Sequence, residues 1–181
     1  MNEKMYKYFC DNNLLTHGIG EISEKETYNK FESIIKHGGL MSKQRLEREG
    51  IIVHGKASDL AYDYRITEKN QISFFDPTLP KFKDRLLSKH YYYYLPFNPN
   101  VIFFIVERKN LSLQQNPTTS FELNENSGFV SIENFKGIIA PNVCAEYLDK
   151  IQKIYGFNLP IYDFDFNITN NLELNTNKRL K

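Results

Sequence analysis

The chain has 181 residues and a mass of 21.3 kDa, a length that favours a single domain. Hydrophobic residues make up 41% of the chain and aromatic residues 14%, which is too apolar for a disordered protein. The 23 Lys and Arg residues nearly balance the 22 Asp and Glu residues, so no global charge draws the chain toward nucleic acid or a membrane.

The sequence shows no signal for Sec-type export or for membrane insertion. The first 13 residues hold lysines but no apolar stretch, so we expect no Sec-type signal peptide. No apolar run approaches the roughly 20 residues that a membrane helix needs. Cys10 and Cys144 have no paired spacing, which predicts free, partly buried thiols in a reducing compartment. We expect no membrane association and a cytoplasmic location, or secretion into a host cell by a non-Sec route.

The first third of the chain predicts a strand followed by a helix. Leu14–Ile19 has the composition of a short strand ending in a glycine turn. Glu26–Lys36 places apolar residues at helical spacing, and His37–Gly39 predicts a glycine cap for that helix. Leu40–Ser42 can then be extended, and Lys43–Glu49 is a helical turn or an exposed loop.

Later elements do not alternate regularly between strand and helix. Two segments have helical patterns: Phe82–Ser88 and Cys144–Ile154. Short apolar runs predict strands, the last of them at an edge: Ile72–Phe75, Val101–Val106, Ser120–Leu123, Gly128–Ile132, Lys136–Ala140 and Leu159–Phe166. The order predicts a mixed α+β domain over residues 1–166, with a flexible tail over 167–181.

Several common catalytic motifs are absent from the sequence. No phosphate-binding loop and no GxSxG nucleophile motif occurs. The histidines are widely spaced and form no zinc-binding pair, so we expect no metal site: His17, His37, His54 and His90.

Two stretches carry a resemblance to a known family. LTHGIG and FESIIKHGGLMSKQRL are similar to the opening of small bacterial ADP-ribosyltransferase-like proteins of the toxin or effector type, where a histidine strand precedes a helix and a GL-x-S turn. GFVSIENFKGIIAP resembles the segment after their catalytic glutamate. With ISFF, the resemblance covers about residues 14 to 155. It implies an α+β, ADP-ribosyltransferase-like fold of two small packed sheets with flanking helices, and NAD bound between the sheets.

The resemblance also implies roles for individual residues. His17 would orient NAD and take part in catalysis, and the backbone of Gly18 would approach the nicotinamide. Ser73 and Phe74 would line the nicotinamide pocket, and Tyr92, within the YYYY run, would close over the cofactor or stack a base. Purely structural roles stay open for each of them.

The catalytic carboxylate has three candidates in the sequence. Breaking the nicotinamide–ribose bond makes the anomeric carbon electron-poor, and a carboxylate beside it stabilises that charge. Glu122 is favoured because it lies in a predicted strand before GFVSIENFKGIIAP, whereas Glu125 lies in a predicted loop and Glu133 just before a strand. Ser120 stands where the commoner toxins have a second Gln or Glu, which speaks against arginine as the acceptor.

Other residues near the first turn favour structural roles. Ser42 is predicted to be the N-cap of the next helix. The basic residues after it alternate with glutamates, which favours a solvated helical face over a pyrophosphate site: Lys43, Arg45 and Arg48.

The sequence therefore predicts an NAD-dependent ADP-ribosyltransferase that modifies a macromolecular acceptor, a protein or a nucleic acid, with a possible antitoxin or host target as partner. One alternative is a catalytically inactive module of the same fold that binds a nucleotide or nucleic acid through Tyr91–Tyr94. Another is a bacterial toxin with RNase activity that uses His17 or His54 as general acid or base.

Overall fold

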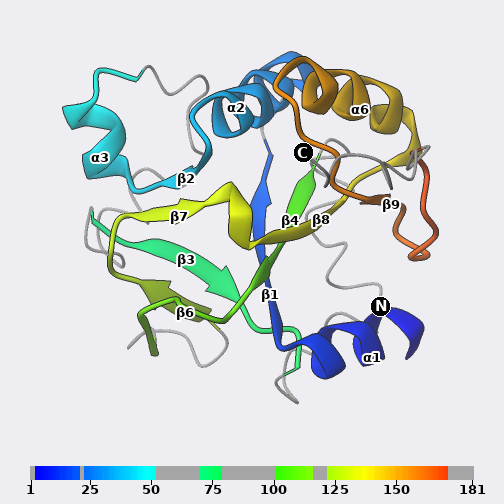
Figure 1. Cartoon of the computed structure of the whole chain (residues 1–181), viewed down its shortest axis with the longest axis horizontal. Helices are drawn as coiled ribbons and strands as arrows, with labels where there is room; N and C mark the ends of the chain where they lie inside the picture. Colours follow the sequence, from blue (N-terminus) through cyan, green and yellow to red (C-terminus); the bar gives the residue numbers. More distant parts are fainter. Residues whose placement is uncertain (1–2, 21–22, 52–69, 79–100, 116–121, 171–181) are drawn as a thin grey trace, which may run out of the picture.

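Seven strands form the main sheet of the protein, in the order β5-β6-β3-β1-β4-β8-β9 (Figure 1). The computed structural model describes residues 3–20, 23–51, 70–78, 101–115 and 122–170. The strands of this sheet are β1 (Leu14–Ile19), β3 (Ile72–Phe75), β4 (Ile102–Glu107), β5 (Leu113–Gln115), β6 (Glu122–Glu125), β8 (Phe135–Ile139) and β9 (Ile161–Tyr162). Neighbouring strands are antiparallel except β8 and β9, which are parallel.

A second, two-stranded sheet, four α-helices and two short 3-10 helices complete the described elements. The small sheet pairs β2 (Gly39–Met41) with β7 (Phe129–Ser131). The α-helices are α1 (Glu3–Asn12), α2 (Glu24–Lys36), α3 (Lys43–Arg48) and α6 (Ala145–Ile154), and short 3-10 helices are η2 (Ile132–Asn134) and η3 (Asn142–Cys144). This confirms the mixed α+β class. One sheet is larger than expected, because β5 and β9 extend it at its two edges.

The two faces of the main sheet carry different cores. Helices α2 and α6 lie side by side over one face, together with the small sheet (Figure 1). Helix α1 packs on the other face through Met5 and Phe9, against Leu14 and Ile105 of the sheet. Successive strand residues alternate between these faces, so the register decides which side chains share a surface.

Helix α2 is capped at both ends, and it begins at Glu24, two residues before the predicted start at Glu26. The Ser23 hydroxyl is the N-cap: it accepts a hydrogen bond from the Glu26 backbone at 3.2 Å and donates to the Glu26 carboxylate at 2.8 Å. At the other end His37 is the C-cap, and Gly38 follows with φ +75°. The predicted glycine cap is confirmed.

The chain beyond the last strand returns to the sheet. Ile168 forms a bridge with Tyr162, and Asn170 accepts a hydrogen bond from the Ile161 backbone at 2.8 Å. The first residues of the expected tail, 167–170, therefore belong to the fold, while 171–181 lie outside the described residues. The predicted helix Phe82–Ser88 and the YYYY run also lie outside them.

Both cysteines are free, as expected: Cys10 is exposed and Cys144 is buried. No helix in the described part of the chain has the length and apolar character required to cross a membrane.

Candidate functional site

His17 occupies the centre of an otherwise apolar row across the main sheet. In the β1–β4 register it lies opposite Phe104, and the pairing of Thr16 with Phe75 puts it opposite Phe74 on β3. The pairings of Phe74 with β6 and of Phe104 with β8 and β9 extend the row. From β6 to β9 it contains Leu123, Phe74, His17, Phe104, Ile138 and Ile161.

The His17 ring is held by one of its two nitrogens. Nδ1 lies 2.8 Å from the carbonyl oxygen of Ser73, and the ring meets Phe74 edge-on at 5.7 Å between centroids. Because a carbonyl only accepts, Nδ1 carries the proton and Nε2 of the neutral ring keeps its lone pair. Burial lowers the pKa of His17, the Ser73 carbonyl opposes this, and the Lys30 charge lowers it further. Nε2 has no hydrogen bond to any described residue.

Glu125 is a buried carboxylate on the same face of the sheet as His17. It ends β6, lies opposite Ile72, and is 2% exposed. Leu123 belongs to the His17 row, and Glu125 follows it by two residues, which returns its side chain to that face. Two strand spacings of about 4.8 Å and two residues of about 3.4 Å put the Cα atoms of His17 and Glu125 roughly 12 Å apart.

Ser127, two residues after Glu125, holds one oxygen of the Glu125 carboxylate. Glu125 Oε2 accepts a hydrogen bond from the Ser127 backbone at 2.9 Å and lies 2.8 Å from the Ser127 hydroxyl. Oε1 has no hydrogen bond within the described ranges.

The turn that carries Ser127 is joined to the turn after β2. The Ser42 backbone donates to the Gly128 carbonyl at 2.9 Å, and the Ser42 hydroxyl caps α3 by accepting from the Arg45 backbone at 3.3 Å. The predicted N-cap role of Ser42 is thus confirmed. Gly128 has φ +74°, and a Cβ there would lie 2.6 Å from the Asn70 side-chain oxygen.

Two other predicted cofactor-binding residues have structural partners. The Ser73 hydroxyl donates to Asn124 at 3.2 Å on the face opposite His17, so only the Ser73 carbonyl meets the imidazole. A Cβ at Gly18 would lie 3.0 Å from the Phe103 ring, which accounts for glycine at that position. Phe74 is fully buried beside His17.

The remaining predicted residues lie apart from this pair. Glu122 begins β6 opposite Phe75, in the row next to that of His17, and its role stays a prediction. Glu133 is exposed in the middle of η2. Tyr92 lies outside the described residues.

The sequence wrongly predicts a loop at Glu125, because its neighbours are polar: Asn124, Asn126 and Ser127. The structure makes it the last strand residue, since β6 pairs on both sides with β3 and β5. The usable signal was the two-residue spacing from Leu123, which puts both side chains on one face of a strand.

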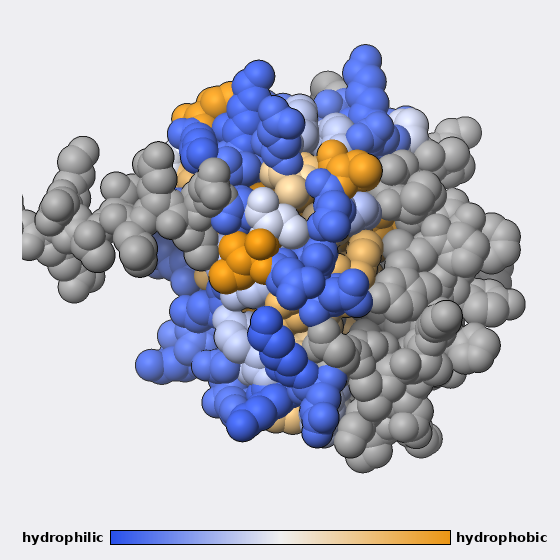
Figure 2. Space-filling view, turned by 90° about the vertical axis from the view of Figure 1, so that its right-hand side faces the viewer, coloured by the Kyte–Doolittle hydropathy of each residue, from blue (hydrophilic) through white to orange (hydrophobic). Residues whose placement is uncertain are grey.

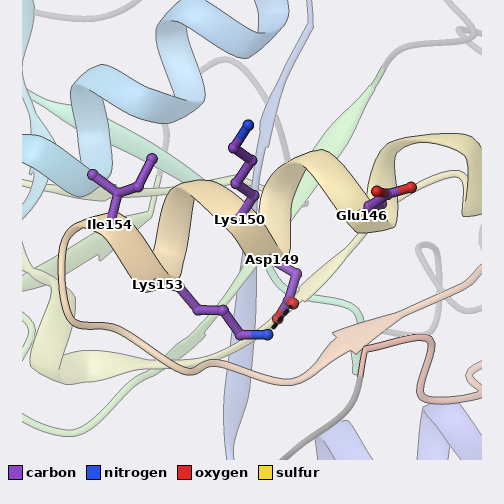
Figure 3. A pocket seen from close by; sticks show the side chains of 5 residues that line it. All are labelled: Glu146, Asp149, Lys150, Lys153 and Ile154. Carbon is purple, nitrogen blue, oxygen red and sulfur yellow. Dashed lines mark ion pairs between the residues drawn. The ribbon is translucent and has the colours of Figure 1, made fainter.

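A surface hollow on α6 has no comparable chemistry (Figure 3). Its lining comes from one helix: Glu146, Asp149, Lys150, Lys153 and Ile154. Asp149 and Lys153 pair with each other at 2.7 Å, and the other side chains point apart. No group of three or more His, Cys, Asp or Glu side chains in the described ranges is arranged to hold a metal ion.

Exposed apolar side chains are scattered over the described surface. Val143, Ile154 and Ile168 are the large hydrophobic residues that stand exposed. Figure 2 shows, on one side of the molecule, hydrophobic residues as separate spots between hydrophilic ones. The described part of that side offers no continuous apolar surface for a partner.

No family model matches the chain, and no match was found among curated proteins or solved structures.

Proposed function

We propose that the protein is an NAD-dependent ADP-ribosyltransferase that modifies a macromolecular acceptor, a protein or a nucleic acid. The observation that carries this proposal is the pair of His17 and Glu125 on one face of the main sheet, a neutral imidazole and a buried carboxylate. The sequence resemblance supports it, because it implies a histidine on the first strand of the sheet and a glutamate on a late one.

The reaction replaces one bond to the ribose with another. The bond between nicotinamide and the anomeric carbon breaks, and its electron pair goes to the nicotinamide ring nitrogen. The anomeric carbon then bonds to a nucleophilic atom of the acceptor, whose proton passes to solvent. A carboxylate hydrogen-bonded to the neighbouring ribose hydroxyl stabilises the positive charge that develops between these events.

His17 is suited to binding rather than to proton transfer in this scheme. Its Nδ1 is committed to Ser73, so Nε2 accepts a hydrogen bond from a ribose hydroxyl of NAD. Because burial disfavours the charged ring, this acceptor persists at neutral pH. The imidazole thus fixes one end of the dinucleotide on the sheet.

Glu125 is the carboxylate that the geometry favours for the ribose. It is buried, one oxygen is fixed by Ser127, and it shares the His17 face. Glu122, which the sequence favours, stands in the neighbouring row of the sheet, and the two are tested side by side.

The experiment incubates the purified protein with labelled NAD and a cell lysate and measures label transferred to macromolecules. Glu125→Gln is expected to lower transfer on the order of 100-fold or more, the usual cost of removing a group that stabilises a transition-state charge. Glu133→Gln, at an exposed position, is the matched control and should transfer normally. Loss of transfer in Glu122→Gln with normal transfer in Glu125→Gln would assign the role to Glu122 instead.

The same preparation separates the alternative functions. Degradation of RNA without added NAD would show that the protein is an RNase and not a transferase. Binding of NAD with no transfer to any fraction of the lysate would show that the protein is a catalytically inactive binding module. Either result overturns the proposed activity.

A further inference from the structure

Ser127 lies in the short connection between β6 and β7 and is exposed, whereas Glu125, two residues earlier, is 2% exposed (Figure 1). The Ser127 hydroxyl lies 2.8 Å from Glu125 Oε2. An exposed residue thus brings a hydroxyl into direct contact with a buried carboxylate. This is the arrangement of a nucleophile and its base.

The other contacts of Ser127 Oγ involve the backbone of Phe129. The Phe129 N–H donates to Oγ at 3.3 Å, and the Phe129 carbonyl oxygen lies 2.8 Å from it. A hydroxyl has one proton and two lone pairs. Because a carboxylate is a stronger acceptor than a neutral carbonyl, the proton is directed to Glu125. One lone pair meets the Phe129 N–H, and the second can form a bond to carbon.

The connection that carries Ser127 is held on both sides. The Asn70 side chain donates to the Asn126 carbonyl at 3.4 Å, and the Ser42 backbone donates to the Gly128 carbonyl at 2.9 Å. The Ser127 backbone N–H donates to the same carboxylate oxygen as its hydroxyl, at 2.9 Å. The hydroxyl is therefore positioned against the carboxylate before any substrate binds, which favours a reaction between groups held together.

We propose that Ser127 accepts ADP-ribose on the protein's own chain and that Glu125 is the base that takes its proton. This assignment rests on the proposed function and names an acceptor within the same site. In the proposed reaction Glu125 hydrogen-bonds the ribose hydroxyl beside the anomeric carbon, so that carbon and Ser127 Oγ meet at one carboxylate. A hydroxyl becomes an effective nucleophile when an adjacent base accepts its proton.

The step breaks one bond to the anomeric carbon and forms another. The bond to nicotinamide breaks, and its electron pair goes to the nicotinamide ring nitrogen. A lone pair of Ser127 Oγ forms the new bond to the anomeric carbon. The hydroxyl proton passes to Glu125 Oε2 and then to solvent. The products are free nicotinamide and a chain that carries ADP-ribose on Ser127.

The test incubates the purified full chain with NAD, without lysate, and locates added ADP-ribose by mass spectrometry of its peptides. We expect it on Ser127. Hydroxylamine separates this product from modified Glu125, because it cleaves an ester to a carboxylate but not a glycosidic bond to serine. Ser23 is the internal control: its hydroxyl also lies 2.8 Å from a carboxylate, that of Glu26, but at the start of α2. Label on Ser23 or another residue in place of Ser127 would overturn the assignment.

Variants test the two roles. Ser127→Ala should lose the label, and Ser127→Thr, which keeps a hydroxyl, should retain it. Glu125→Gln should lower labelling on the order of 100-fold, because it removes the base. Ser131→Ala is the matched control in β7, since the Ser131 hydroxyl accepts from the Glu133 backbone at 3.3 Å, and it should be labelled like the wild type.

Modification within one chain has a kinetic consequence. The labelled fraction at a given time should not depend on protein concentration, and a Glu125→Gln chain mixed with the wild type should stay unlabelled. Labelling of that chain by the wild type would make Ser127 an ordinary surface acceptor and would overturn the pairing with Glu125.

The outcomes distinguish this inference from the proposed function. If the wild type labels macromolecules of the lysate but not its own Ser127, the Ser127 assignment is wrong and the transferase stands. If Ser127 is labelled but no component of the lysate is, self-modification stands and the separate acceptor fails. If NAD labels neither, both are overturned.

Discussion

Nδ1 of His17 lies 2.8 Å from the carbonyl oxygen of Ser73, and this contact determines which nitrogen of the ring is free. The carbonyl accepts the only ring proton, so Nε2 is an acceptor in the neutral form. Ser73 in turn directs its hydroxyl to Asn124 on the other face of the sheet. One residue of β3 therefore orients the candidate ligand-binding ring and also links β3 to β6.

The lowered pKa of His17 predicts a specific pH dependence of stability. The ordinary value is 6.5, and burial is the main cause that lowers it. Below about pH 6.5 the unfolded chain binds a proton that the native ring does not, so the free energy of unfolding decreases as pH falls toward the native pKa. Above about pH 6.5 the His17 ring is neutral in the native and the unfolded state, so His17 no longer makes the free energy of unfolding depend on pH.

The variant His17→Asn isolates this contribution, because its amide keeps a donor near Ser73 but does not titrate. Urea unfolding at about pH 7.5 and about pH 5 should show a smaller loss of stability for the variant than for the wild type. An equal loss in both proteins would mean that another group causes the pH dependence.

Thr16 carries a buried hydroxyl with no hydrogen-bond partner in the described structure, and it is 5% exposed. Thr16→Val replaces the hydroxyl by a methyl group of similar size, so it should stabilise the protein by about 1 kcal/mol. The matched control is Thr27→Val. Thr27 is fully buried and donates to the Ser23 carbonyl at 3.4 Å, so its loss should destabilise by about 1 kcal/mol.

Urea unfolding measures both threonine variants against the wild type. Opposite signs for the two changes are the expected result. If Thr16→Val is less stable than the wild type, the Thr16 hydroxyl makes a stabilising hydrogen bond, and the reason given for this prediction is wrong.

Much of the fold could be predicted from local patterns. The strands Leu14–Ile19 and Ile72–Phe75 have the predicted bounds, because apolar and β-branched residues lie between clear turn signals. Helix α1 was not predicted: its buried contacts are only Met5 and Phe9, and the rest of its sequence is polar. Strand β5 was not predicted either, since Leu113–Gln115 is short and polar and forms only by pairing with β6.

The candidate site was harder to predict because it depends on register. The glycines after His17 mark it in the sequence, but no local pattern shows that Phe104 and Phe74 lie on either side of it. The face that Glu125 occupies follows from its pairing with Ile72, a residue more than fifty positions earlier. Pairing between distant segments leaves no local pattern, so the choice among the glutamates needed the folded sheet.

Asp76 is a buried carboxylate at the end of β3, with its side chain 4% exposed. Thr78 donates to it from its backbone at 2.9 Å and from its hydroxyl at 2.6 Å, and Arg108 forms an ion pair with it. Arg108→Met would leave the carboxylate buried without a counter-charge, so we expect a loss of about 3 kcal/mol in the free energy of unfolding.

An exposed ion pair gives the control for that prediction. Lys136 and Glu107 pair at 2.8 Å with side chains 40% and 33% exposed, so Lys136→Met should destabilise the protein much less than Arg108→Met. Similar losses in Arg108→Met and Lys136→Met, measured by urea unfolding, would contradict the structural role given to Asp76.

The turn that holds Glu125 should be sensitive to any side chain at Gly128. This glycine has φ +74°, and a Cβ would lie 2.6 Å from the Asn70 side-chain oxygen and 3.0 Å from the Ser42 hydroxyl. Gly50 has a similar φ of +66° but no atom within 4 Å of an added Cβ. Gly50→Ala therefore carries only the backbone strain, about 1 kcal/mol.

Gly128→Ala adds the two steric contacts to the same backbone strain, so we expect it to cost about 2 kcal/mol or more. Relief of the contact with Ser42 would shift Ser127, which donates to Glu125 Oε2, and would move the carboxylate. Transfer of label from NAD should therefore fall in Gly128→Ala well beyond its effect on stability, and stay normal in Gly50→Ala. Full transfer by a folded Gly128→Ala protein would show that the Ser127 turn does not position the proposed catalytic carboxylate, Glu125.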